Sequence, residues 1–476
     1  MTSFVKIGVS QLQLVGVPVR VENIPVTCLP IYTAVHDLEA PASPVKVPTV
    51  TESSHLHLNQ NERKSLVSLL YSKHDVFNYS TISVGQALGE EHAIELKHDH
   101  PIRLPVRHVP ENLKPEYEKI LSDLIESGII QGSNSPYAAP TVFIRQGEKY
   151  RLCIDFCKLN NITIKDVYPL PRIEDLLYDA SKYKFFSSLD LCKASWQVPM
   201  RPSDISKTTF ITPYGLYEWK YMAFGLCNAP ATFQHYVTKI LKDGANLLEP
   251  SISAYIDDIL VASNTFEEHL DKLDQTLALL QKAGLKVNGT KCSLVQTKVI
   301  FLGRVNEPGK ISIKNNAKDF LDKIEMPRTR RDVQRLMGFL NYYGMFIPDL
   351  DDKTRMILNL LKKSVDFKWT WQEQQALDGI KLELKKIPSL NTPDYAKDFI
   401  IDCDASAVAI RGILSQDING IESPVQYFSR KLRASERNYG ATKCEMLALV
   451  ESLKKFHYFI LGRKFTVELI TALLHG

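Results

Sequence analysis

The chain has 476 residues, of which 58 are Lys or Arg and 54 are Asp or Glu, and its formal net charge is +4. A chain of this length is too long for one hydrophobic core, so we expect two to four domains. With 44% hydrophobic and 24% charged residues, the composition excludes a largely disordered chain. The near balance of charge leaves nucleic-acid binding open, because net charge alone does not reveal it.

The eight cysteines are scattered without a CxxC or a paired His motif, so neither a zinc site nor a disulfide framework is indicated. The N-terminal residues lack the layout of a signal peptide, and no later stretch reaches about eighteen uninterrupted apolar residues. We therefore expect no membrane span.

The N-terminal half begins with an extended segment followed by two helices. The prolines between Pro18 and Pro48 predict a connector. Asn59 can cap the first helix, with Glu62 at its third position. A second helix is predicted from about Lys114 to Ser127, where Gly128 ends it.

A β-hairpin is predicted after these helices. Its strands are Thr141–Arg145 and Tyr150–Phe156, joined at Gln146 and Gly147. The hairpin would carry three basic side chains, Arg145, Lys149 and Arg151.

Two further amphipathic helices and a separate α/β unit are predicted in the second half. One helix has leucines from Leu270 to Leu280 and ends at Gly284. Another is capped by Thr329 and runs to Leu340. Near the C-terminus, Phe399–Cys403 has the pattern of a short strand and Thr442–Phe456 that of a helix.

The stretch SISAYIDDILVAS, Ser251–Ser263, places Asp257 and Asp258 inside an otherwise apolar, strand-like run. Two like charges buried there would cost roughly several kcal/mol unless they are compensated, and no Lys or Arg lies within the run. A hard divalent cation such as Mg²⁺ is the natural compensator. The alternative is a solvent-exposed Asp-Asp hairpin turn.

A third acid, Asp190, ends the strand-like segment Lys184–Leu191 among apolar neighbours. Three carboxylates on adjoining strand ends would form a two-metal site, in which one ion activates a primer 3′-hydroxyl and the other holds a triphosphate.

Seven blocks in this order resemble the reverse transcriptase of gypsy-type LTR retrotransposons. They are SPYAAPTVFI (135–144), RLCIDFCKLN (151–160), YPLPRIEDLL (168–177), SSLDLCKASWQVP (187–199), FGLCNAPATFQ (224–234), YIDD (255–258) and FLG (301–303). The resemblance covers roughly residue 56 to the C-terminus. It implies an α+β fold: a right-hand polymerase with fingers, palm and thumb, followed by a connection segment and a partial RNase H-like α/β unit.

The resemblance also implies a division of the chain. Residues 1–55 would be a connector downstream of a missing protease, 56–310 the fingers and palm with the start of the thumb, 311–390 the thumb and connection helices, and 391–476 a truncated RNase H-like domain. No protease signature and no integrase start are present, so we expect a fragment of a longer polyprotein or of a broken element.

For the palm, the resemblance implies that Asp190 and Asp257 ligate two Mg²⁺ ions, that Asp258 assists, and that the backbone carbonyl of Leu191 is a further ligand. Mn²⁺ is the expected substitute metal. Lys291 matches the lysine proposed to protonate the leaving pyrophosphate, although the usual proline before it is here Gly289.

For the nucleotide, Lys149 and Arg151 match the fingers residues that hold the triphosphate, and a solvated hairpin tip is the alternative. Phe224 and Gly225 match the strip near the base and sugar. Ser195 occupies a position where a bulky Tyr or Phe is usual.

The turn Phe301, Leu302 and Gly303 resembles the primer grip, which supports the primer end. For Phe301, plain core packing is an equally good interpretation.

In the C-terminal unit, Asp404 and Glu445 match the first two metal ligands of an RNase H. The catalytic Asp position then falls on Ile470, and Arg411 replaces a glycine of the first strand motif. We therefore expect the RNase H part to be inactive.

Together these residues predict an RNA-directed DNA polymerase. Its partners would be a primed RNA or DNA template and deoxynucleoside triphosphates, and the active enzyme could be a homodimer. It would be intracellular, in a cytoplasmic retroelement particle or in the nucleus. The rival hypothesis is a non-enzymatic remnant that binds nucleic acid without turnover, and it draws on Ser195, Ile470 and Cys157, which stands where Arg is usual.

Overall fold

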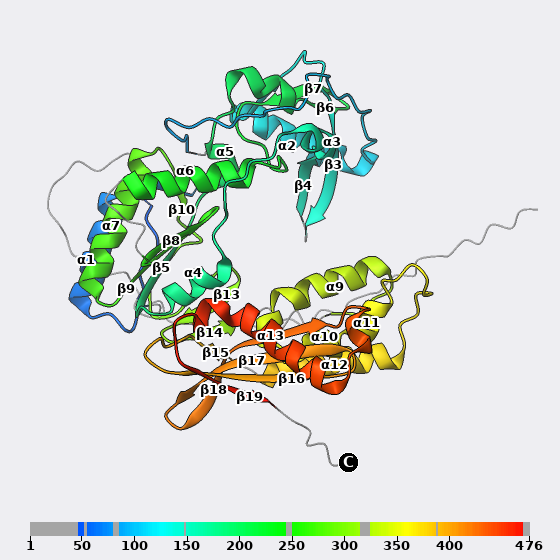
Figure 1. Cartoon of the computed structure of the whole chain (residues 1–476). Helices are drawn as coiled ribbons and strands as arrows, with labels where there is room; N and C mark the ends of the chain where they lie inside the picture. Colours follow the sequence, from blue (N-terminus) through cyan, green and yellow to red (C-terminus); the bar gives the residue numbers. More distant parts are fainter. Residues whose placement is uncertain are drawn as a thin grey trace, which may run out of the picture. The chain divides into compact units, whose positions relative to one another are not determined.

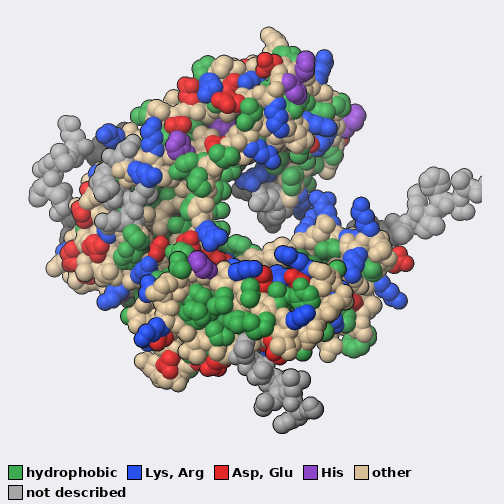
Figure 2. Space-filling view, in the orientation of Figure 1, with side chains coloured by type: hydrophobic (Ala, Val, Ile, Leu, Met, Phe, Trp, Pro, Cys, Tyr) green, Lys and Arg blue, Asp and Glu red, His purple; other side chains and the backbone are tan. Residues whose placement is uncertain are grey.

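The computed structural model describes residues 46–51, 55–79, 85–146, 149–243, 250–314, 324–386 and 389–469. Most of the predicted connector therefore lies outside the described residues. The chain divides into the units Met1–Val45 and Lys46–Gly476, and everything below concerns the second unit. On the face shown in Figure 2, acidic and basic side chains are interspersed, in keeping with the small net charge.

All five helices that the sequence predicted individually are present, together with two long helices, of 15 and 16 residues, that it did not place, and several short ones (Figure 1). They are α1 (Gln60–Ser72), α2 (Lys114–Glu126), α3 (Cys157–Ile162), α4 (Ile173–Ala180), α5 (Ala194–Gln197), α6 (Ala229–Asp243), α7 (Phe266–Lys282), α9 (Arg330–Tyr342), α10 (Leu350–Lys353), α11 (Arg355–Asn359), α12 (Trp371–Lys386) and α13 (Ala441–Ile460). In the described part of the chain, no helix is long and apolar enough to cross a bilayer.

Helix α1 begins with the predicted capping box. The Asn59 side chain accepts a hydrogen bond from the Glu62 backbone N–H at 2.9 Å, and the Glu62 carboxylate accepts one from the Asn59 N–H at 2.7 Å. We expect Asn59→Ala to lower the free energy of unfolding by about 1 kcal/mol, measured by urea denaturation. Asn61→Ala, at the second position of the helix, is the matched control, and an equal loss in both variants would contradict the assignment.

The fingers contain a five-stranded sheet in the order β2-β7-β6-β3-β4. Its strands are β2 (Ile130–Gly132), β7 (Gly215–Trp219), β6 (Phe210–Thr212), β3 (Ala139–Gln146) and β4 (Lys149–Ile154). The predicted hairpin is present, because β3 and β4 pair antiparallel with Ile144 opposite Arg151. Strand β4 ends at Ile154 rather than Phe156, and β3 continues through Gln146, so the predicted turn position at Gln146 was wrong by one residue.

The palm sheet has the order β11-β5-β9-β8. Its strands are β11 (Ser293–Gln296), β5 (Phe185–Asp190), β9 (Asp258–Ser263) and β8 (Ile252–Tyr255). Ile259 and Val261 of β9 join one core, whereas Leu260 and Ala262 join another. Burial of both faces explains why this strand is a continuous apolar run instead of an alternating one.

Three further sheets complete the fold. Short strands β1 (Phe77–Asn78) and β10 (Val287–Asn288) pair in parallel. The fourth sheet joins β12 (Val299–Phe301), β13 (Arg304–Glu307), β14 (Lys310–Ile313) and β15 (Ser389–Asn391). The fifth has the order β18-β17-β16-β19 and consists of β18 (Ile421–Lys431), β17 (Ala409–Ile418), β16 (Phe399–Ala405) and β19 (Phe465–Leu469), with α13 packed on β16 and β17.

Two hydrophobic cores hold these elements together. The first combines the fingers with the α6 and α7 side of the palm sheet. The second is shared by the opposite palm face, the β12–β15 sheet, α9 and the C-terminal sheet; Leu260, Ile311, Leu340 and Phe456 all belong to it. The predicted C-terminal α/β unit is present, but its buried side chains are continuous with those of the preceding segment.

Candidate active site

The three predicted carboxylates meet at the end of the palm sheet. Asp190 is the last residue of β5 and lies directly opposite Asp258, the first residue of β9. Asp257 precedes it in the β8–β9 turn, where Ile256 has φ of 53°. The Leu191 N–H donates to the Asp257 carbonyl oxygen at 2.8 Å, so main-chain bonding ties the turn to the end of β5.

The buried amide of Gln234 on α6 fixes the same turn. Its Oε1 accepts from the Ile256 N–H at 2.7 Å, and its Nε2 donates to the Ala254 carbonyl at 3.0 Å. Gln234 is 3% exposed. Sequence reasoning missed its role, since a glutamine after an apolar stretch gives no signal of a contact 22 residues away.

The two adjacent aspartates lie in different surroundings. Asp257 is exposed, as in the hairpin-turn alternative, whereas Asp258 is partly buried. Burial, together with the charges of Asp257 and Asp190, raises the pKa of Asp258 to about 6. Loss of surrounding water and the charge of Asp190 also raise the pKa of Asp257. The site therefore carries more negative charge than its surroundings neutralise.

One cation reaches this site from elsewhere in the chain. Lys291 Nζ lies 3.2 Å and 3.1 Å from the two carboxylate oxygens of Asp190. No Lys or Arg lies in the run around Asp257, but the acid cluster has a basic neighbour in Lys291, which the resemblance had placed in the palm.

In the described residues, no three His, Cys, Asp or Glu side chains are grouped closely enough to hold one metal ion. The chemistry of the donor set nevertheless fits Mg²⁺, which takes carboxylate and carbonyl oxygens. The raised pKa values of Asp257 and Asp258 indicate the excess negative charge that a divalent cation would offset.

The loop before Lys291 explains its departure from the family pattern. A side chain on Gly289 would place its Cβ 2.2 Å from the ring of Tyr79. With Tyr79 in this position, neither proline nor any residue other than glycine fits without displacing the ring.

In the fingers, Arg151 is exposed on β4, and its guanidinium carbon lies 6.0 Å from the centroid of the Phe224 ring. The structure therefore brings these two predicted nucleotide contacts together. The side chain of Lys149 lies outside the described residues.

The loop after Phe224 is fixed by a residue that sequence reasoning did not single out. Gly225 has φ of 94°, a conformation that favours glycine. Asn160 Nδ2 donates to its carbonyl oxygen at 2.8 Å, and Asn160 Oδ1 accepts from the Cys227 N–H at 3.0 Å. Asn160 lies in the block RLCIDFCKLN, and only that block membership pointed to it.

Ser195 lies in α5, partly buried. Its neighbour Trp196 packs against Phe224 and Trp219, each with ring centroids 5.7 Å apart, and Lys193 Nζ lies 4.3 Å from the Trp196 ring centroid.

The predicted primer grip combines a core residue with a turn. Phe301 is 1% exposed and belongs to the second core, so its ring serves packing. Leu302 and Gly303 form the turn that follows, with φ of 47° and 71°. The Tyr342 hydroxyl donates to the Leu302 carbonyl oxygen, and a Cβ on Gly303 would lie 3.0 Å from that hydroxyl.

Comparison with known proteins identifies the fold and the family. Residues 144–305 match the family described as reverse transcriptase (RNA-dependent DNA polymerase), and residues 369–467 match the RNase H-like domain found in reverse transcriptase. The chain is 33% identical over 422 residues to the retrovirus-related Pol polyprotein from transposon 297 of Drosophila melanogaster, which covers 86% of this chain and 39% of that protein. It is 34% identical over 382 residues to the transposon Tf2-3 polyprotein of Schizosaccharomyces pombe, covering 78% of this chain and 28% of that protein.

The chain belongs to the reverse transcriptases of retrotransposon Pol polyproteins. It spans less than half the length of these relatives. Its fold is similar to that of the foamy viral protease-reverse transcriptase in complex with RNA/DNA hybrid, with a TM-score of 0.76 at 22% identity over 90% of this chain and 58% of that one. The same viral protein in complex with dsDNA gives a TM-score of 0.75 over 90% of this chain and 91% of that one. The predicted family and fold class are thereby confirmed.

In the RNase H-like domain, Asp404 on β16 lies opposite Arg411 on β17. The Arg411 guanidinium bonds Asp404 Oδ2 at 2.6 Å and Asp349 Oδ2 at 2.8 Å. The first predicted metal ligand is thus already neutralised by a guanidinium. Glu445 is partly buried on α13, and Ile470 lies outside the described residues.

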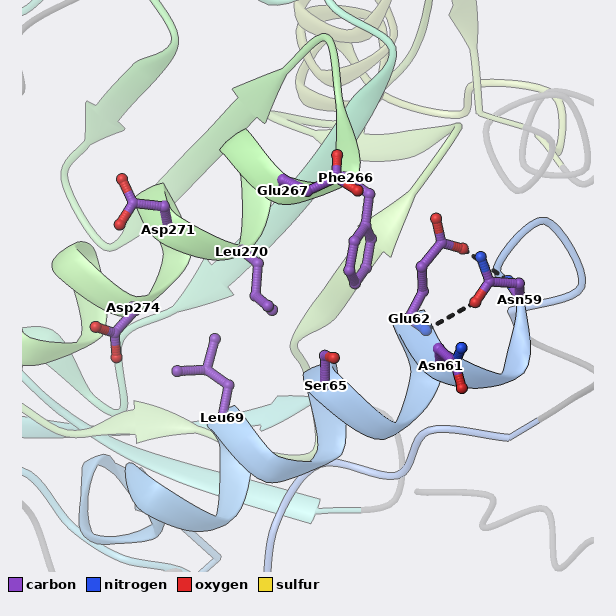
Figure 3. A pocket seen from close by; sticks show the side chains of 10 residues that line it. All are labelled: Asn59, Asn61, Glu62, Ser65, Leu69, Phe266, Glu267, Leu270, Asp271 and Asp274. Carbon is purple, nitrogen blue, oxygen red and sulfur yellow. Dashed lines mark hydrogen bonds between the residues drawn. The ribbon is translucent and has the colours of Figure 1, made fainter.

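A separate groove of about 610 Å³ lies between α1 and α7 (Figure 3). Leu69, Phe266 and Leu270 are among its apolar residues. Its acidic lining residues are Glu62, Glu267, Asp271 and Asp274. This lining repels phosphate, and the groove shares no residue with the carboxylate site.

Proposed function

We propose that this chain is an RNA-directed DNA polymerase that extends a primer 3′ end with deoxynucleotides. The observation that carries the proposal is the in-register pairing of Asp190 with Asp258, beside Asp257, in a reverse transcriptase fold. Neighbouring carboxylates raise one another's pKa, and a divalent cation held between them would offset that repulsion.

Asp190, Asp257, Asp258 and the carbonyl of Leu191 would hold two Mg²⁺ ions, with Mn²⁺ as a substitute. When bound, these ions neutralise charge on the triphosphate and make the primer hydroxyl more acidic. Gln234 and the Leu191 N–H hold the turn that carries Asp257, so this carboxylate is positioned before substrate binds.

The remaining side chains would bind and orient the nucleotide. Arg151 on β4, with Lys149 at the start of the same strand, would hold the triphosphate, because a basic pair matches its charge. Phe224 and Gly225, fixed by Asn160, would lie against the base and sugar. Lys291 carries protons at Nζ and would donate one to the leaving pyrophosphate.

The test is primer extension by the full chain on a primed RNA template. Extension should require Mg²⁺, stop when EDTA is added and resume when Mg²⁺ is restored in excess. Omission of Mg²⁺ without loss of extension would contradict the proposal.

The alternative is a remnant that binds nucleic acid without turnover. Two residues favour this alternative. Cys157 is exposed at the start of α3, where the family has Arg, and Ser195 is the second. Binding of the primed template without any extension in the same assay would establish this alternative.

RNase H activity is expected to be absent even where polymerase activity is present. Arg411 forms an ion pair with the Asp404 carboxylate, and the Ile470 side chain has no oxygen to bind a metal. Two ions therefore cannot be held in the required geometry. The measurement is release of short fragments from the RNA strand of an RNA/DNA hybrid, with Asp404→Asn as the control. Release above that control would show that the domain is active.

A further inference from the structure

A cavity of about 1170 Å³ is lined by residues of α4, β13, α9 and α13, which are labelled in Figure 1. Six of its lining residues are basic: Arg172, Lys182, Arg304, Lys454, Lys455 and Arg463. Glu174 is the single acidic residue in the lining. Such an excess of positive charge in a hollow attracts and concentrates anions.

Most of this charge is not neutralised by the protein. Lys182 pairs with Asp179 at 2.6 Å and Lys454 with Glu451 at 3.0 Å. Among the residues that the structure describes, the other four cations form no ion pair; they are Arg172, Arg304, Lys455 and Arg463. The side chains that line this cavity therefore carry a net positive charge.

Arg304 shows the imbalance most clearly, because it is 4% exposed. Its guanidinium lies over the rings of Tyr342 and Phe346, at 5.2 Å and 5.7 Å from their centroids, and one nitrogen donates to the Tyr342 carbonyl at 3.0 Å. Its Nε and the other terminal nitrogen have no hydrogen-bond partner. A buried charge without a counter-charge is strongly unfavourable, and an anion in the cavity that Arg304 lines would offset it.

The position and the other lining residues favour a nucleic-acid backbone as that anion. Tyr342 lines the cavity and also bonds the Leu302 carbonyl in the predicted primer-grip turn. Tyr342 thus connects the wall of the cavity to the turn where the primer end would be supported. Tyr395 and Tyr458 add aromatic rings beside the cations, a combination typical of surfaces that bind single strands or strand backbones.

We propose that this cavity binds backbone phosphates of the nucleic-acid substrate on the far side of the turn at Leu302 and Gly303. The inference rests on the proposed polymerase function and adds a second anchoring point to it. Arg172 and Lys455, both exposed, make the direct contacts, and the buried Arg304 supplies a fixed positive field.

The test measures the Kd of the full chain for a labelled primed RNA template at several KCl concentrations. Arg172→Gln and Lys455→Gln remove one cation each without touching the core, and the Arg172 side chain makes no capping bond to α4. Lys64→Gln, on the exposed surface of α1, is the matched control. The slope of log Kd against log[KCl] should fall by about one unit in each cavity variant and stay unchanged in the control.

Wild-type slopes in both cavity variants would overturn the proposal. Direct binding of pyrophosphate, measured at constant ionic strength, is the second arm: if both cavity variants weaken it but keep the wild-type slope for the primed template, the cavity binds free phosphates instead of a strand. The proposed polymerase function is tested separately, and it fails if the wild type does not extend the primer. Asp257→Asn should lose extension and keep the wild-type slope, so the two outcomes do not depend on each other.

Discussion

Asp257→Asn is expected to abolish primer extension, with a loss of at least about a thousandfold, while binding of the primed template stays within about twofold. Asparagine keeps the size of the side chain but removes the charge that would hold the metal, and about 4 kcal/mol of lost stabilisation corresponds to this factor. The turn should survive, because its bond to Leu191 uses the main-chain carbonyl of residue 257.

Single-turnover extension at saturating primed template separates chemistry from binding. The matched control is Asp271→Asn, since Asp271 is an exposed acid on α7 in the groove away from the palm carboxylates. Wild-type extension by purified Asp257→Asn would show that the site assignment is wrong.

The local structure of the site could be predicted because it depends on near neighbours in the chain. Asp190 and Asp258 end and begin apolar runs, so strand formation alone places both at strand ends. The caps at Asn59 and Thr329 follow from spacing of three residues and are both present as capping boxes.

The contacts that set the charge of the site could not be predicted from local sequence patterns, because they join distant residues; only the resemblance placed Lys291 at the site. Lys291 reaches Asp190 across 101 positions, and Arg411 reaches Asp349 across 62. Neither pair has a periodic pattern or a fixed spacing in the sequence. The substitution at Arg411 was visible as a departure from the family, but only the cross-strand register with Asp404 shows that it neutralises a predicted ligand.

Ser195→Tyr is expected to raise discrimination against ribonucleotides by at least about tenfold, or about 1.4 kcal/mol. In the family that this chain resembles, a large ring at this position lies against the nucleotide sugar and leaves no room for a 2′-hydroxyl. Serine leaves that room, and a pocket that merely tolerates an added hydroxyl discriminates by only about 10²-fold. The wild type should therefore accept ribonucleotides unusually well.

The side chains around Ser195 decide whether another ring can replace the missing one. Trp196 is held by Lys193 on its ring face and by contacts with Trp219 and Phe224. It cannot turn toward the sugar without giving up these contacts. Phe224 is 51% exposed, so it is the ring with freedom to fill the space.

The comparison is the ratio of kcat/KM for a deoxynucleotide to that for its ribonucleotide, in the wild type, Ser195→Tyr and Ser195→Ala. Alanine is as small as serine and should leave the ratio unchanged, so a rise confined to tyrosine isolates the effect of bulk. Phe224→Ala in the wild-type background tests the refilling ring: if Phe224 acts as the gate, the ratio falls in this variant. An unchanged ratio in Ser195→Tyr, together with a fall in Phe224→Ala, would place sugar selection at Phe224 and refute the role of position 195.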